Sequence, residues 1–133
     1  MYGFNVTVEG DFDDVVSRVI EELKAEGFGV LTEIDVKETL KAKLGVDRLP
    51  YRILGACNPP LAHKAIEAEP DIGLLLPCNV TVEADGSAAS IVRIANPELI
   101  LSVGSLEEDP ELSAVAQEAR QRLERVAEFL LAS

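Results

Sequence analysis

The sequence predicts an α+β fold, in which a single, mainly antiparallel sheet carries helices packed on one face. Apolar and polar residues alternate over 4–9, which is the period of a half-buried strand. Apolar residues recur at helical spacing over 12–23 and again over 112–130. Asp85-Gly86 is a strong hairpin signal. Strands interleaved with helices and joined by a hairpin favour one antiparallel sheet with helices against one side.

Two helices in the first half of the chain have clear end signals. Asp11 is a sound N-cap for the first helix, and Gly27 can adopt the left-handed conformation that ends it. Residues 35–38 have the spacing of a capping box and begin a second helix, which Gly45 ends. The other strands predicted in this half are 28–34 and 51–57.

In the second half, proline after Asn or Asp marks where elements begin and end. Asn58 is expected to cap a helix with proline in its first turn, where the missing N–H costs nothing. This helix ends before Pro70, and Asp109 caps the last helix in the same manner. Asn96 is followed by proline and ends a strand. The remaining predicted segments are the strands 72–83 and 88–95 and a short helix in the apolar stretch 99–103.

Composition and charge exclude several classes of function. With 133 residues, of which 47% are hydrophobic and 27% charged, one globular domain over 1–133 is expected. A net charge of −12 repels phosphate, so we expect no nucleic-acid partner. No stretch approaches the roughly 20 apolar residues that span a bilayer, and the N-terminus resembles no signal peptide. Together with only two cysteines, this predicts a cytoplasmic protein with no membrane association.

The two cysteines are the best candidates for a site. Cys57 ends a predicted strand directly before a helix cap, where free N–H groups and the helix dipole favour a thiolate. Cys78 shares a strand face with Leu76, Val80 and Val82 and should point toward the core, where a free cysteine usually acts as a small apolar filler. The two sulfurs approach each other if their strands are neighbours.

The register of the hairpin at Asp85 decides where Arg93 lies. A two-residue turn places Arg93 opposite Cys78, where a guanidinium would stabilise a thiolate. A three-residue loop turns Arg93 outward and puts Val92 and Ile94 on the face of Cys78. The second register buries more aliphatic surface, and we prefer it.

His63 is the only histidine, and it lies about one helical turn beyond Cys57. It is a candidate base or third ligand beside the cysteines, since zinc and copper accept this set of donors. A solvated helix position is the better interpretation. The close C-x-x-C spacing of a strong metal motif is missing, so no cofactor is predicted.

The motifs around the cysteines, YRILGACNP at 51–59 and GLLLPCNV at 73–80, resemble the domain-of-unknown-function 302 family. The resemblance extends over nearly the whole chain. It implies a single sheet with packed helices, similar to the TATA-binding-protein-like arrangement, and a homodimer, but no established activity. The positions that match the motifs are Cys57, Asn58, Pro59, Leu76, Pro77, Cys78 and Asn79.

Three functions remain open. The preferred one is a homodimeric ligand-binding or interaction module with a small-molecule ligand. The second is thiol-redox or sulfur-handling chemistry with Cys57 as the thiolate and Cys78 as its partner. The third is soft-metal binding, of zinc or copper, at Cys57 and Cys78. The candidate ligand-binding residues are Asn58, Pro59, Pro77 and Asn79.

Overall fold

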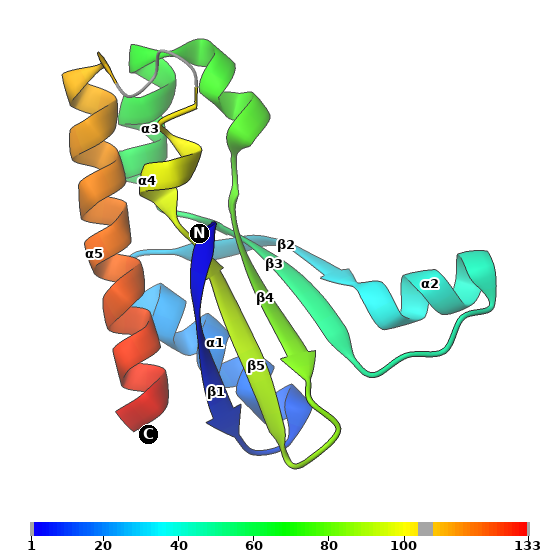
Figure 1. Cartoon of the computed structure of the whole chain (residues 1–133). Helices are drawn as coiled ribbons and strands as arrows, with labels where there is room; N and C mark the ends of the chain where they lie inside the picture. Colours follow the sequence, from blue (N-terminus) through cyan, green and yellow to red (C-terminus); the bar gives the residue numbers. More distant parts are fainter. Residues whose placement is uncertain (1, 104–107, 133) are drawn as a thin grey trace.

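The chain forms one sheet with helices gathered mainly on one side of it (Figure 1). This computed structural model describes residues 2–103 and 108–132. The strands are β1 (Gly3–Glu9), β2 (Gly29–Asp35), β3 (Tyr51–Cys57), β4 (Cys78–Ala84) and β5 (Ala89–Ala95). The helices are α1 (Phe12–Ala25), α2 (Val36–Leu44), α3 (Pro59–Ala68), α4 (Pro97–Ile100) and α5 (Pro110–Ala132), with a 3-10 turn at Pro70–Leu75.

The sheet has the strand order β1-β5-β4-β3-β2, and every neighbouring pair is antiparallel. β1 and β2 are therefore the two edges, and β4 lies in the centre. The predicted α+β class with a single antiparallel sheet is confirmed. Within residues 2–103 and 108–132, no helix is long and apolar enough to cross a membrane.

The two faces of the sheet differ in what they contact. Val80 and Val82 of β4 lie beside Ile94 and Val92 of β5, and all four side chains are buried. Helix α1 contacts β4 and β5 on this face, while α5 contacts β1 and α1. Burial of this aliphatic layer is the main source of stability, since each fully buried Val or Leu contributes about 1.5–3 kcal/mol. Among the described residues, no helix lies over the opposite face (Figure 1).

The β4–β5 hairpin has the preferred three-residue loop. Thr81 is paired with Arg93, and Asp85 N donates to Ala89 O across the loop. Arg93 therefore points to the open face, where its Nη1 donates to Oε1 of Glu83 at 2.7 Å. The outward position of Arg93 is confirmed, and it does not contribute charge to the face of Cys78.

The predicted strand 72–83 is wrong in its first half. Residues 70–75 form a 3-10 turn, and the peptide bond between Leu76 and Pro77 is cis. Proline cannot donate to a sheet ladder, so Pro77 stops β4 from extending toward the N-terminus. The turn separates two side chains that a strand would have placed on one face: Ile72 is completely buried, whereas Leu74 is 87% exposed.

Helix α2 extends away from the rest of the molecule (Figure 1). Its ends are as predicted, because Glu38 N donates to Oδ1 of Asp35 at 2.9 Å and Gly45 adopts φ 67°. None of its side chains is buried. The expectation that helices pack on one sheet face thus holds for α1 and α5 but not for α2, whose preceding strand carries it beyond the sheet.

Candidate functional site

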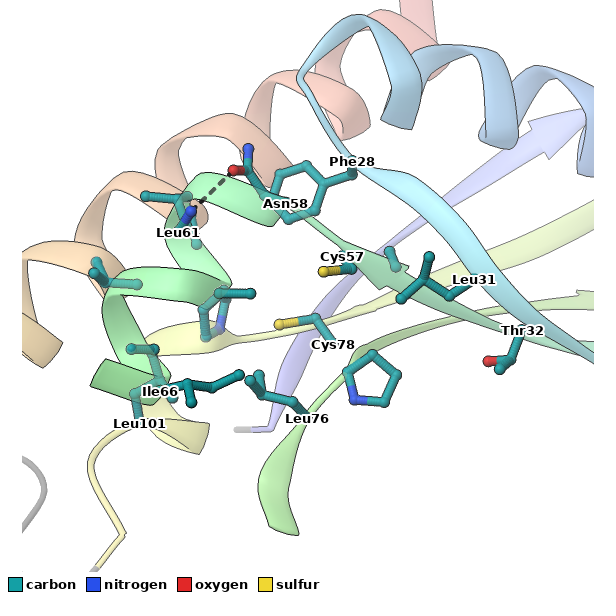
Figure 2. A pocket seen from close by; sticks show the side chains of 17 residues that line it. Phe28, Leu31, Thr32, Cys57, Asn58, Leu61, Ile66, Leu76, Cys78 and Leu101 are labelled. Carbon is teal, nitrogen blue, oxygen red and sulfur yellow. Dashed lines mark hydrogen bonds between the residues drawn. The ribbon is translucent and has the colours of Figure 1, made fainter. Parts of the chain in front are cut away.

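An apolar cavity of about 310 Å³ lies where the C-terminal end of β3 meets the N-terminal end of β4, beneath α3 (Figure 2). Strand β2, the segment before β4, and the helices α3 and α5 also contribute walls. The lining residues are Phe28, Leu31, Thr32, Ala56, Cys57, Asn58, Leu61, Ala62, Ala65, Ile66, Leu76, Pro77, Cys78, Pro97, Leu101, Val115 and Ala119.

Asn58 fixes the start of α3 at the cavity. Its side-chain Oδ1 accepts a hydrogen bond from Leu61 N at 3.2 Å, as the predicted cap requires. Asn58 is only 7% exposed, so this amide is part of the buried wall. The cap orients α3 so that Ala62 and Ile66, one turn apart, face the cavity together with Leu61 and Ala65.

Both cysteines line this cavity. Cys78 is paired with Ala56 across the β3–β4 ladder, and Cys57 follows Ala56 at the end of β3. Each cysteine is half-buried and carries a free thiol, and in Figure 2 both sulfur atoms point into the cavity. The chain therefore brings the Ala56–Asn58 corner and the Pro77 corner to one pocket, with no disulfide between the two cysteines.

The Cys78 thiol is held in its neutral form. Burial raises its pKa to about 11, and the nearby Cys57 adds to the effect in the same direction. At neutral pH, Cys78 is a protonated, weakly polar group on an apolar wall. The sequence interpretation of Cys78 as a side chain that faces the interior is consistent with this position.

β2, β3 and the Pro77 corner approach one another closely at Gly55, beside the cavity walls formed by Thr32 and Pro77. A Cβ atom on Gly55 would collide with Oγ1 of Thr32 and lie 2.9 Å from Cγ of Pro77. Glycine at this point of β3 therefore lets the two flanking segments approach. Sequence reasoning did not single out Gly55 or Thr32, although a glycine inside a predicted strand is a signal of close backbone approach.

Two of the predicted ligand-binding residues do not line the cavity. Pro59 is exposed in the first turn of α3 and is not a wall residue. Asn79 points to the opposite face of the sheet, because successive residues of a strand alternate between faces. It lines a separate surface hollow with Tyr51, Thr81 and Arg93. Of the four predicted residues, Asn58 and Pro77 are at the cavity.

His63 is exposed on α3 and does not line the cavity. In the part of the chain that the structure describes, no group of three metal-ligating side chains is brought together. The structure therefore does not support a metal site that uses His63 as a third ligand with the cysteines. Its position agrees with the solvated helix residue favoured from the sequence.

Several wall residues come from segments that the sequence did not connect to the cysteines. Leu31 and Thr32 approach from β2, while Val115 and Ala119 approach from α5. Helical periodicity marked the α5 residues as core, but it does not tell which element they pack against. Only the tertiary arrangement assigns these side chains to the site.

These features define a small α+β protein with a pocket at one end of its sheet. Residues 4–130 match the family described as "Domain of unknown function DUF302", and the chain belongs to this family, as its cysteine motifs predicted. It is similar to the structure titled "Crystal structure of uncharacterized conserved protein DUF302 from Bacillus stearothermophilus", with a TM-score of 0.83 and 29% identity over 96% of this chain and 97% of that one. The comparison with curated proteins finds no match.

Proposed function

We propose that the protein binds an uncharged, largely apolar small molecule in the cavity beneath α3. The observation that carries this proposal is the composition of the walls. Among the lining residues there is no Asp, Glu, Lys, Arg or His, in a chain of which 27% is charged. The volume of about 310 Å³ lies at the lower end of the range of ligand pockets, about 300–1,000 Å³.

The polar groups of the pocket are few, as is usual for sites that orient an apolar ligand. They are the Thr32 hydroxyl, the Asn58 amide and the two thiols. Since Cys78 is protonated at neutral pH, it presents no charge to a ligand. A carboxylate or an ammonium group placed inside would be desolvated without an ionic partner, which is strongly unfavourable. The pocket therefore favours neutral ligands over charged ones of the same size.

The test uses N-phenyl-1-naphthylamine, a neutral fluorophore whose emission rises in apolar surroundings. We expect saturable binding, with hexanol displacing the probe at lower concentration than hexanoate. Ala62→Phe places a ring at the half-buried wall of the cavity and should weaken probe binding about tenfold or more, whereas Ala114→Phe, on the exposed side of α5, should not. Equal binding to both variants and the unmodified protein would refute the proposal.

A second candidate function is thiol chemistry with Cys57 as the nucleophile. What favours it is that both free thiols share one pocket while Cys78 stays protonated, so that a reaction at neutral pH would begin at Cys57. In this reaction the Cys57 thiol gives its proton to solvent, its sulfur forms a bond to an electrophilic carbon of the bound molecule, and the leaving group departs with the electron pair of the bond that breaks.

Iodoacetamide labelling tests this candidate, since the sulfur displaces iodide and each product is resolved by mass spectrometry. At pH 7 we expect Cys57 to be alkylated faster than a model thiol and Cys78 to remain unlabelled. Cys57→Ser should abolish the fast phase, and Cys78→Ser should retain it. If Cys57 reacts no faster than the model thiol, the thiol function is excluded while the ligand-binding proposal stands.

A further inference from the structure

A second hollow, of about 450 Å³, lies on the face of the sheet opposite α1 and α5. It extends over β1, β5 and β4, which are adjacent in the sheet (Figure 1). Gly3 of β1 is paired with Ala95 of β5, and neither has a side chain large enough to fill this part of the face. Tyr2 and Tyr51 also line the hollow and contribute aromatic surface. None of the described residues lines both this hollow and the apolar cavity.

Three polar side chains that line the hollow lie in one row across the sheet. Arg93 of β5 is paired with Asn5 of β1 on one side and with Thr81 of β4 on the other. Residues directly opposite each other in an antiparallel pair have Cβ atoms about 4.5–5.5 Å apart, so the three side chains are within reach of one small ligand. A guanidinium, an amide and a hydroxyl can all donate hydrogen bonds. The row therefore offers several donors to a single acceptor group.

The charge of the hollow favours an anion, although the whole chain has a net charge of −12. Among the described residues that line it, Arg93 has the only charged side chain. Nη1 of Arg93 donates to Oε1 of Glu83 at 2.7 Å, and Nη2 of Arg48 donates to Oε2 of the same carboxylate at 2.8 Å. These hydrogen bonds lower the pKa of Glu83, so its carboxylate is ionised at neutral pH. Two guanidinium groups thus share one carboxylate, which leaves a positive charge in excess.

One edge of the Arg93 guanidinium remains available to an anion. The bond to Glu83 uses Nη1, whereas Nε and Nη2, on the other edge of the plane, have no hydrogen-bond partner within residues 2–103 and 108–132. The N–H groups of this edge match the two oxygens of one carboxylate. The Arg93 side chain is 46% exposed, so a dissolved ligand can reach it. The ion pair with Glu83 orders the guanidinium before a ligand arrives, which lowers the cost of binding.

The Thr81 hydroxyl is a second, independent indication of a ligand. Its Oγ1 is buried and has no hydrogen-bond partner in the part of the chain that the structure describes. A buried hydroxyl without a partner costs free energy, and native structures keep few such groups. Because Thr81 lies opposite Arg93, an acceptor held by the guanidinium would be within reach of this hydroxyl after a change of the χ1 rotamer. The unused hydroxyl and the unused guanidinium edge therefore call for the same group, a negatively charged acceptor with two oxygens.

From these observations we infer that the hollow is a binding site for a small organic carboxylate. The Nε and Nη2 groups of Arg93 bind its two oxygens, and Asn5 and Thr81 donate to the same oxygens from the neighbouring strands. The rest of the molecule lies over the Gly3–Ala95 pair and against Tyr51. This site takes an anion, whereas the apolar cavity favours neutral molecules. The inference therefore goes beyond the proposed function and does not depend on it.

An NMR titration of the isotope-labelled full chain with benzoate, a planar carboxylate, tests the site. We expect saturable shifts of the backbone amides of β1, β4 and β5 around the polar row, and of the Arg93 Nε–H signal. Benzamide has the same ring without the charge, and inorganic phosphate has the charge without the apolar part. Each should bind about tenfold more weakly than benzoate, because it lacks one of the two kinds of contact.

Two substitutions at Arg93 separate its charge from its geometry. Arg93→Gln removes both and should raise the Kd for benzoate about tenfold or more. Arg93→Lys keeps the charge without the planar pair of donors and should recover only part of this loss. Arg120→Gln is the matched control, since the Arg120 side chain is 41% exposed and also paired with a carboxylate, that of Glu98, but lies on α5 outside the hollow. This control should bind benzoate as the unmodified protein does.

Thr81→Val distinguishes a ligand-binding hydroxyl from a structural one. It keeps the shape of the side chain and should weaken benzoate binding, while the ligand-free protein stays at least as stable in urea because an unpaired buried hydroxyl has been removed. The inference is overturned if benzoate causes no saturable shifts at the hollow, or if benzamide or phosphate binds as tightly as benzoate. It is also overturned if Arg93→Gln binds benzoate as tightly as Arg120→Gln.

Discussion

Cys78 lies opposite Ala56 in the β3–β4 ladder, and this one pairing brings its thiol into the cavity that Cys57 also lines. A shift of β4 by one residue against β3 would turn Cys78 to the open face and place Pro77 or Asn79 opposite Ala56 instead. The register is held by the buried pair Leu54 and Val80, which follows in the same ladder. The site is therefore a consequence of core packing in the sheet.

The raised pKa of Cys78 predicts a pH-dependent stability. The folded state keeps the proton up to a pKa of about 11, whereas an unfolded chain releases it near 8.5. The stabilisation is thus fully present below about pH 8.5 and is lost as the pH rises toward 11. Urea unfolding should show a steeper loss of stability over this interval for the unmodified protein than for Cys78→Ala. Equal slopes would contradict the burial of the thiol.

The Asn58 cap predicts a measurable contribution to stability. Asn58→Ala removes the acceptor for Leu61 N and should lower the free energy of unfolding by about 1 kcal/mol. Asn58→Ser keeps a capping oxygen and should recover part of this loss. Asn96→Ala, which removes the cap of the four-residue α4, is a control with a smaller expected effect. If Ala and Ser at position 58 are equally destabilising, the cap is not the cause.

The 3-10 turn before β4 predicts unequal effects at two similar residues. Ile72→Ala creates a void in the core and should cost about 2–5 kcal/mol, whereas Leu74→Ala should change stability by less than about 0.5 kcal/mol. In a strand, the two side chains would share a face. Comparable losses in chemical denaturation would therefore argue for the strand that the sequence predicted.

The close approach at Gly55 predicts a coupled pair of substitutions. Gly55→Ala forces a methyl group against Oγ1 of Thr32 and should cost about 1–3 kcal/mol. Thr32→Ala removes that oxygen, so the double variant should be more stable than the sum of the two single effects implies. The remaining loss should reflect Cγ of Pro77, which stays in place. Additive effects in the double-mutant cycle would show that the two residues do not touch.

Most of the fold was predictable because its signals are local. The strand 51–57 has the predicted bounds. Helix α2 begins at the Asp35 cap and ends at Gly45, as their side-chain and backbone chemistry requires. The hairpin register followed from a comparison of buried aliphatic surface. The strand predicted over 72–76 was wrong for a physical reason: a short apolar stretch has the same composition in a strand and in a buried turn.

The site was predictable only in part. The two cysteines and Asn58 lie at the ends of strands and helices, where the neighbouring residues in the sequence indicate what surrounds them. Asn79 lies on the opposite face of β4 from the cavity, because one step along a strand reverses the face. The walls formed by Leu31 and Val115 depend on which elements pack together, and this information is spread over the whole chain.

The uncovered face of the sheet has a consequence for how the chain can vary in length. In β4, Val80 and Val82 face the helices, while Thr81 and Glu83 face outward. Loss or gain of a single residue inside this strand would turn the Glu83 carboxylate toward the core and expose the valine side chains to water. The hairpin loop at 86–88 can change in length without reversing the faces of β4. We therefore expect length differences among relatives to occur in this loop more often than within β4.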